Sequence, residues 1–264
     1  MPGAHDSADV PELDIRDDTR RHLEFVANRF GVNPQPKLVL MLEGETELHA
    51  VQRIFDEVFG LHPGRCGIEL MNLGGVSNAT GGKQDRYQAI FRLIDYLHHH
   101  QTMTYLLLDN EGQALHLQRT AKHKASIHRH RKRVTRPEYI HVWKQSFEFD
   151  NFTDTELAAA LTTVARGAGT FEVAEVATCR TSQEAGARLG ALFKARTSRT
   201  QPKIELLDAL LTPLLAVGRR GSLNARVIVR QLRKVIGLTA KNPLPVMQAI
   251  WAKNQQSKLL SRKR

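Results

Sequence analysis

Runs of mainly apolar residues of strand length recur through the first half of the chain. They occupy residues 38–42, 68–73 and 104–108. Strands of this kind are typical of a parallel sheet that is covered on both faces. Between them, residues 46–58 and 84–97 carry apolar side chains at helical spacing. With residues 141–148 as a fourth predicted strand, the alternation predicts an α/β fold, a mostly parallel sheet flanked by helices.

The pattern becomes helical after Asn151. Thr153 with Glu156, and Thr181 with Glu184, have the spacing of capping boxes that open helices. Further helices are predicted at residues 203–217, 222–236 and 244–253. We therefore expect a lead-in with a short helix (1–35), an α/β catalytic domain (36–150) and a basic helical C-terminal region (151–264).

The charge of the chain is divided unevenly along its length. The 264 residues include 38 Lys and Arg against 27 Asp and Glu, a net charge of +11. Residues 1–112 hold 10 basic and 17 acidic residues, whereas residues 113–264 hold 28 and 10. A strongly basic second half predicts a polyanionic partner such as nucleic acid.

Composition excludes several classes of protein. A hydrophobic content of 41% with 25% charged residues excludes a chain that is disordered throughout. Two cysteines do not form a disulfide framework. The acidic first 18 residues are unlike a signal peptide, and no apolar run approaches the ~20 residues of a membrane-spanning helix. We therefore expect a cytoplasmic protein that does not associate with membranes.

Acidic residues follow three of the predicted strands. They are Glu43 and Glu47, Asp109 and Glu111, and Glu148 and Asp150. Ligands of open α/β sheets bind at the carboxyl ends of the strands, so these carboxylates are expected to share one edge. Because converging carboxylates repel one another, a hard divalent cation, Mg²⁺ or Mn²⁺, is the expected cofactor. Solvation or helix capping is the alternative for any single one of them.

Two of these acidic motifs carry a resemblance to a known family. Leu42-Glu-Gly-Glu-Thr-Glu47 after one strand, with Asp109-Asn-Glu111 after a later one, resembles a Toprim domain over about residues 37–160. The downstream Phe147-Glu-Phe-Asp-Asn-Phe152 makes the chain most similar to the OLD (overcoming lysogenization defect) nucleases. Family members usually show Asp-x-Asp where this chain has Asp-x-Glu.

The resemblance implies a set of functional residues and a partner. It places Glu43 and Glu47 on one metal ion and Asp109 and Glu111 on a second, with Glu148 or Asp150 as a further ligand. It also implies a catalytic lysine from the C-terminal part, for which Lys241 is our candidate and Lys203 its rival. OLD nucleases carry an ABC-type ATPase, and its phosphate-binding loop does not occur in this sequence. A separate ABC-type ATPase subunit is therefore the expected partner.

Basic residues form two further groups that suit nucleic-acid binding. The first lies between the third and fourth predicted strands and comprises Arg119, Lys122, Lys124, Arg129, Arg131, Lys132 and Arg133. The second, Arg226, Arg230 and Arg233, has the spacing of one helix face. Phosphate neutralisation by either group would give binding without sequence preference. A solvated loop is the alternative for the first group.

Three interpretations of function follow. The sequence cannot separate DNA from RNA, endonuclease from exonuclease, or monomer from homodimer. The first interpretation is a Mg²⁺- or Mn²⁺-dependent DNA endonuclease of the Toprim/OLD type, which the resemblance associates with anti-phage defence and an ATPase partner. The second is a non-catalytic nucleic-acid-binding subunit of an ATPase complex, and the third a primase-like nucleotidyl transferase.

Overall fold

A computed structural model describes most of the chain outside its two ends. The described residues are 36–75, 93–94, 96–97, 102–110, 114–115, 118–119, 137–182, 184–216 and 220–241. Four parallel strands form one sheet in the order β2-β1-β3-β4. Their bounds are β1 Leu38–Leu42, β2 Ile68–Asn72, β3 Met103–Leu108 and β4 Ile140–Val142. The predicted α/β class with a parallel sheet is confirmed.

The two central strands are buried along their whole length. In β1, Leu38, Leu40 and Leu42 face one hydrophobic core, while Val39 and Met41 face a second core on the other side of the sheet. This alternation follows from the two-residue period of a strand, which sends successive side chains to opposite faces. Burial of both faces accounts for the uninterrupted apolar run in the sequence.

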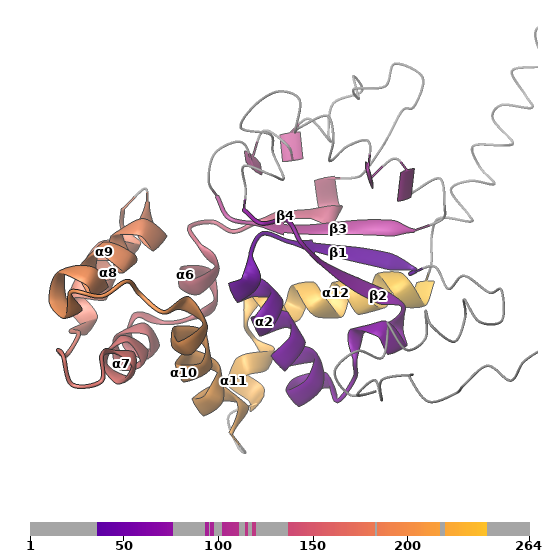
Figure 1. Ribbon diagram of the computed structural model, residues 1–264. Coiled ribbons are helices and arrows are strands. Elements are labelled where there is room, and N and C mark those ends of the chain that lie inside the picture. Colours follow the sequence, from indigo (N-terminus) through magenta and orange to yellow (C-terminus); the bar gives the residue numbers. More distant parts are fainter. Residues whose placement is uncertain are drawn as a thin grey trace, which may run out of the picture.

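Two helices cover one face of the sheet (Figure 1). The first is α2, Glu45–Ile54, which continues into a π-helical turn, Phe55–Phe59. The second is α12, Val227–Lys241, which comes from the far end of the described chain and packs against β1 and α2. The Tyr105 hydroxyl of β3 donates a 2.6 Å hydrogen bond to Gln231 of α12 and ties that helix to the sheet.

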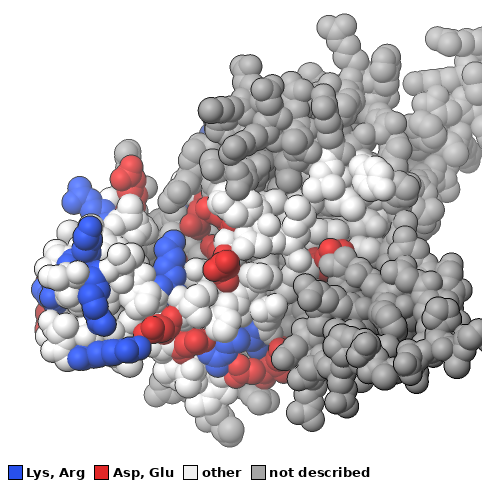
Figure 2. All heavy atoms as spheres, viewed as in Figure 1, with Lys and Arg blue, Asp and Glu red and all other residues white. Residues whose placement is uncertain are grey.

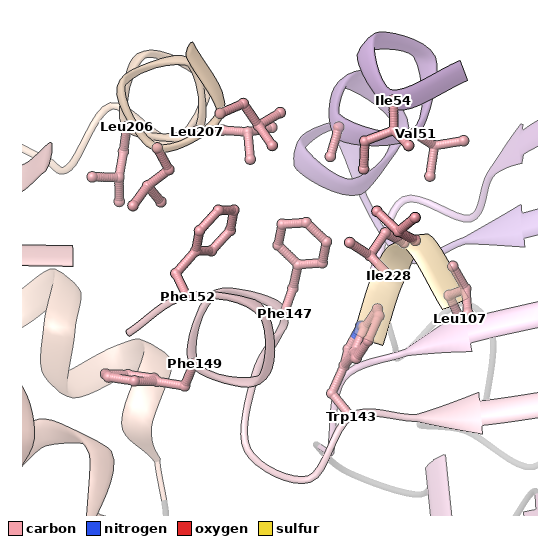
Figure 3. Close-up of a cluster of buried hydrophobic side chains, with 14 of the residues drawn as sticks. Val51, Ile54, Leu107, Trp143, Phe147, Phe149, Phe152, Leu206, Leu207 and Ile228 are labelled. Atoms are coloured by element: carbon pink, nitrogen blue, oxygen red, sulfur yellow. The ribbon is translucent and has the colours of Figure 1, made fainter. Parts of the chain in front are cut away.

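The remaining helices form a lobe beside the sheet (Figure 1). They are α6 Phe147–Asn151, α7 Asp154–Ala165, α8 Val173–Arg180, α9 Ala185–Thr197, α10 Lys203–Leu215 and α11 Arg220–Asn224. Phe147 and Phe152 point toward Leu206 and Leu207 of α10 (Figure 3). The core that contains these side chains also contains Trp143 and residues of β1, β3 and α12. The hydrophobic core therefore runs across the boundary expected between residues 150 and 151.

Two arginines connect the segments of the lobe. Arg226 donates to both carboxylate oxygens of Glu156, at 2.9 and 2.6 Å, and to the Asn151 carbonyl at 2.8 Å. Arg180 makes a 2.7 Å ion pair with Asp154 and donates to the carbonyls of Phe149 and Phe152. Each guanidinium thereby satisfies backbone oxygens where α6 ends and α7 begins.

The fourth expected strand, at residues 141–148, is confirmed only at its start, and its expected extent is wrong. The chain leaves the sheet after Val142, and α6 begins at Phe147 instead of continuing an extended segment to residue 148. Local hydrogen bonds explain the change. The Ser146 hydroxyl accepts from the Phe149 amide as a helix N-cap, and the Asp150 carboxylate accepts from the amides of Lys144 and Gln145.

Most of the other expected elements are confirmed. The capping box of Thr153 and Glu156 opens α7, and the helices expected at 46–58 and 203–217 correspond to α2 and α10. The helix expected at 222–236 is split into α11 and α12. The capping box expected at Thr181 is wrong, because Thr181 is the C-cap of α8 and α9 begins at Ala185, with Glu184 as an N-cap that makes no side-chain capping bond.

Three expectations lie wholly or partly outside the described residues. They are the lead-in at 1–35, most of the helix at 84–97, and the helix at 244–253. Among the described helices, none is both long enough and apolar enough to span a bilayer.

Replacement of Arg226 by Met tests how strongly the lobe depends on this ion pair. The variant keeps the aliphatic stem but leaves the half-buried Glu156 carboxylate and the Asn151 carbonyl without their donor. We expect the free energy of unfolding to fall by about 2 kcal/mol, measured by urea denaturation at pH 7. Arg230→Met, at an exposed position of α12, is the matched control and should change it by less than about 0.5 kcal/mol. Equal effects would contradict the structural role of Arg226.

Candidate active site

The candidate site lies at the point where the strand order reverses. From β1, the chain first adds β2 on one side of the sheet and then adds β3 and β4 on the other side. The switch point of the sheet therefore lies between β1 and β3. In open α/β sheets, ligands bind outside the carboxyl ends of the strands at this point. Glu43 directly follows β1 and Asp109 directly follows β3. The Asp109 amide donates a 2.6 Å hydrogen bond to Glu43 Oε2.

Glu47 enters the site from the first turn of α2. Its side chain is only 6% exposed. A Cβ atom placed on Gly44 would lie 3.3 Å from Glu47 Oε2, a tighter approach than most side chains tolerate. The glycine between strand and helix therefore lets the Glu47 carboxylate lie against the backbone at the end of β1.

Glu148 reaches the same site from the first turn of α6. The Ser146 hydroxyl donates a 2.8 Å hydrogen bond to Glu148 Oε2. The next residue along, Phe147, donates its amide to Asp109 Oδ1 at 2.9 Å. The short helix that replaces the expected strand therefore orients two carboxylates of the site.

Burial and mutual repulsion raise the pKa values of two of these groups. Burial raises the pKa of Glu47 to about 7, and the charges of Glu148 and Glu43 add to the effect. Burial raises the pKa of Asp109 to about 9, again with contributions from Glu43, Glu148 and Glu47. Carboxylates with raised pKa values that converge in a cleft are typical of functional sites.

The carboxylates line one wall of a cavity of about 880 Å³. The opposite wall is formed by α9 and the start of α10, including Lys194 and Lys203. Lys203 is close enough to lower the pKa of Glu47, against the larger effect of burial. Acidic side chains gather where the lobe meets the sheet, with basic side chains beside them on the lobe (Figure 2).

A divalent cation fits this site in chemistry and in charge. The four carboxylates offer only hard oxygen donors, which Mg²⁺ and Mn²⁺ prefer, and a cation would relieve the repulsion that raises their pKa values. Among the described residues, however, no three Asp, Glu, His or Cys side chains converge closely enough to hold an ion. The expected metal ligand Glu111, two residues after Asp109, lies outside the described residues.

Other expected site residues are placed elsewhere. Asp150 is not among the residues that line the cavity, since its carboxylate accepts from the amides of the turn at 144–145. Arg226 is paired with Glu156, so it does not belong to an exposed basic stripe with Arg230 and Arg233. Arg230 and Arg233 are exposed on α12.

The remaining expected residues are only partly described. Arg119 is exposed. Lys241 ends α12, and its side chain is not described. The other basic residues of the first group lie outside the described residues, namely Lys122, Lys124, Arg129, Arg131, Lys132 and Arg133. Of the two candidate lysines, Lys203 is therefore the one that the structure places beside the carboxylates.

Sequence reasoning missed several residues of the site. Ser146 has a recognisable signal, because a serine two residues before an acidic residue at a helix start is typical of an N-cap. Lys194, Gly186 and Gly190 have no such signal. They reach the cavity only because α9 packs against α6 and α7.

No family model, curated protein or solved structure matches this chain.

The raised pKa values predict an unusual pH dependence of stability. In the folded chain the pKa of Asp109 is about 9 and that of Glu47 is about 7, whereas the ordinary pKa values of these side chains are 3.8 and 4.5. Between the ordinary pKa and the folded-state pKa of each group, the folded state therefore binds more protons than the unfolded state. The contribution of the two groups to the free energy of unfolding should fall as pH rises from about 4, until each folded-state pKa is passed.

Asp109→Asn isolates this effect, because the amide keeps an oxygen acceptor for the Phe147 amide but has no proton to lose. In EDTA-containing buffer at pH 8 we expect the variant to be more stable by about 2–4 kcal/mol, with the difference vanishing near pH 4. Urea denaturation across this range measures it. Asp208→Asn is the control, and it should lower the free energy of unfolding at pH 8 instead of raising it. Although partial burial raises the pKa of Asp208, hydrogen bonds from His49 and Arg53 bring it below its usual value. A less stable Asp109→Asn at pH 8 would contradict the raised pKa.

Proposed function

We propose that this chain is a Mg²⁺- or Mn²⁺-dependent nuclease of the Toprim/OLD type, which hydrolyses the phosphodiester bonds of DNA. The observation that carries the proposal is that four carboxylates line one cavity at the switch point of a parallel sheet, together with Lys203. They are Glu43, Glu47, Asp109 and Glu148. Four carboxyl groups in one cavity need a cation before all of them can ionise. Divalent cations held by carboxylates typically bind substrate phosphates as well.

The four carboxylates would hold the cations. When bound, divalent ions neutralise these groups and supply Lewis-acid activation of a phosphodiester. The protein contributes the orientation of its ligands. The Phe147 amide fixes Asp109 Oδ1, the Asp109 amide fixes Glu43 Oε2, and the Ser146 hydroxyl fixes Glu148 Oε2. Ligands held in this way keep their geometry without reorganising during the reaction.

Lys203 would act on the substrate from the other wall. Its ammonium group lies on the exposed first turn of α10, facing the cavity. A fixed positive charge there offsets the negative charge that builds on the phosphoryl oxygens in the transition state. Its position beside Glu47 supports Lys203 as the catalytic lysine.

DNA, an ABC-type ATPase partner and a role in anti-phage defence complete the proposal. They follow from the resemblance of the Glu43 and Asp109 motifs to OLD nucleases. One observation favours the alternative of a non-catalytic nucleic-acid-binding subunit: the described residues alone do not form a coordination site. Metal binding distinguishes the two functions.

Metal binding should therefore be measured directly. Isothermal titration with Mn²⁺ at pH 8 should show binding by the native chain, and Mn²⁺ should raise its melting temperature by several degrees through ligand-linked stabilisation. Asp109→Asn should lose both effects. Asp56→Asn, at an exposed position far along the α2 segment, should retain them. Absence of Mn²⁺ binding by the native chain would favour the non-catalytic function.

Cleavage tests the catalytic assignment. With Mn²⁺, the native chain should nick or linearise plasmid DNA, and Glu43→Gln should abolish the reaction. Lys203→Met should lower the rate constant by about 100-fold, the usual loss when one stabilising group of a transition state is removed. Lys37→Met, before the start of β1, is its matched control and should cleave normally. Equal rates for the two lysine variants would remove Lys203 from the mechanism.

A further inference from the structure

The part of the cavity wall that α9 contributes consists of four small residues, Leu189 and one lysine. Gly186, Gly190 and Lys194 lie four residues apart on α9, so they share one face of the helix, and all three line the cavity. Ala187 and Ala191 line it beside them. This face of α9 therefore offers a smooth surface that ends in a positive charge.

Packing does not require either glycine. A Cβ atom on Gly186 would lie 3.6 Å from the nearest atom of Ser146, and one on Gly190 would lie 3.7 Å from Gln201 Oε1. Both are ordinary van der Waals distances. Glycine weakens a helix interior relative to alanine. Two glycines that the fold does not need, both facing the cavity, indicate that what enters the cavity approaches the helix backbone closely.

Lys194 is available to a ligand, unlike three arginines of the lobe. Arg166, Arg180 and Arg196 are paired with Glu205, Asp154 and Glu175. Within the described part of the chain, the ammonium group of Lys194 makes no hydrogen bond or ion pair, and the residue is exposed at the cavity wall. The cavity thus has carboxylates on one side and an unpaired cation on the other, an arrangement that suits a phosphate chain between them.

We propose that this face of α9 binds the sugar–phosphate backbone of a single strand of nucleic acid, with Lys194 on a phosphate next to the one that faces the carboxylates. This inference rests on the proposed function and names its substrate class. It assigns Lys194 to binding, and Gly186 and Gly190 to the close approach of the strand.

The shape of the cavity favours a single strand over a duplex. Its volume of about 880 Å³ lies in the range of clefts that bind small ligands. At one end α9 contacts α6, and a Cβ atom on Gly186 would lie 3.6 Å from Ser146, so the two walls meet there. One strand can pass between such walls, whereas a duplex would have to separate first. No aromatic side chain is present among the described lining residues, so stacking does not select the bases.

Fluorescence anisotropy with a labelled 12-nucleotide oligothymidylate tests the proposal, with Ca²⁺ in place of Mn²⁺ to prevent cleavage. The native chain should bind this strand at least about 10-fold more tightly than a blunt duplex of equal length. Lys194→Gln should weaken binding about 5- to 10-fold and reduce the salt slope by about 0.7, the value for one phosphate contact on a single strand. Arg188→Gln, on α9 but outside the cavity lining, should weaken it less than 2-fold.

Gly190→Leu tests the surface itself. Leucine suits a helix, so the melting temperature should not fall, while binding of the strand should weaken at least about 10-fold. Gly237→Leu on α12, where no atom lies within 4 Å of the added Cβ, is the control.

Three results would overturn the inference: duplex binding as tight as strand binding, no binding of either, or equal effects of Lys194→Gln and Arg188→Gln. Mn²⁺ binding and plasmid cleavage by the same preparation would leave the proposed function standing. Loss of Mn²⁺ binding and of plasmid cleavage as well would contradict both this inference and the proposed function.

Discussion

Parallel pairing of β1 with β3 is the constraint on which the site depends. The register sets Leu42 beside Leu107, so the residues that follow each strand emerge next to each other at the same edge. Glu43 and Asp109, 66 residues apart in sequence, are thereby held within one hydrogen bond. The apolar faces of both strands fix this register, because a slip of one residue would turn their side chains to the wrong core.

The segment from Trp143 to Phe152 transmits that arrangement to the lobe. Its aromatic side chains pack into the core beneath the sheet, while its amides and hydroxyl groups orient Asp109 and Glu148. Arg180 and Arg226 then hold the end of α6 against α7 and the start of α12. The same short stretch therefore supports the fold with its apolar groups and the site with its polar groups.

The distribution of charge separates structural residues from candidate functional ones. Arg180, Arg196 and Arg226 are neutralised by carboxylates within the chain. The carboxylates at the sheet edge instead share a cavity with one another and with two lysines. Burial of like charges costs stability in the absence of a ligand, as the raised pKa values of Glu47 and Asp109 express. A ligand that contains both cations and phosphates would complement both walls.

Sequence alone determined three of the four strands, the parallel class of the sheet and the acidic residues that follow β1 and β3. An uninterrupted apolar run indicates a strand that is buried on both faces, and Gly44 between Glu43 and Glu47 indicates a tight turn. Local patterns were therefore sufficient to predict these features. It did not determine how Glu148 reaches the site, because Ser146 and Asp150 make hydrogen bonds that convert an expected strand into a helix.

Only the tertiary structure decided which basic residues face the acids. Arg226 belonged to a regular basic stripe in the sequence, but its guanidinium is held by Glu156, 70 residues away. Lys194 belonged to no motif, yet the packing of α9 brings it to the cavity. Helical spacing shows which residues share a face of one helix. What that face meets depends on contacts between distant segments, which no local pattern encodes.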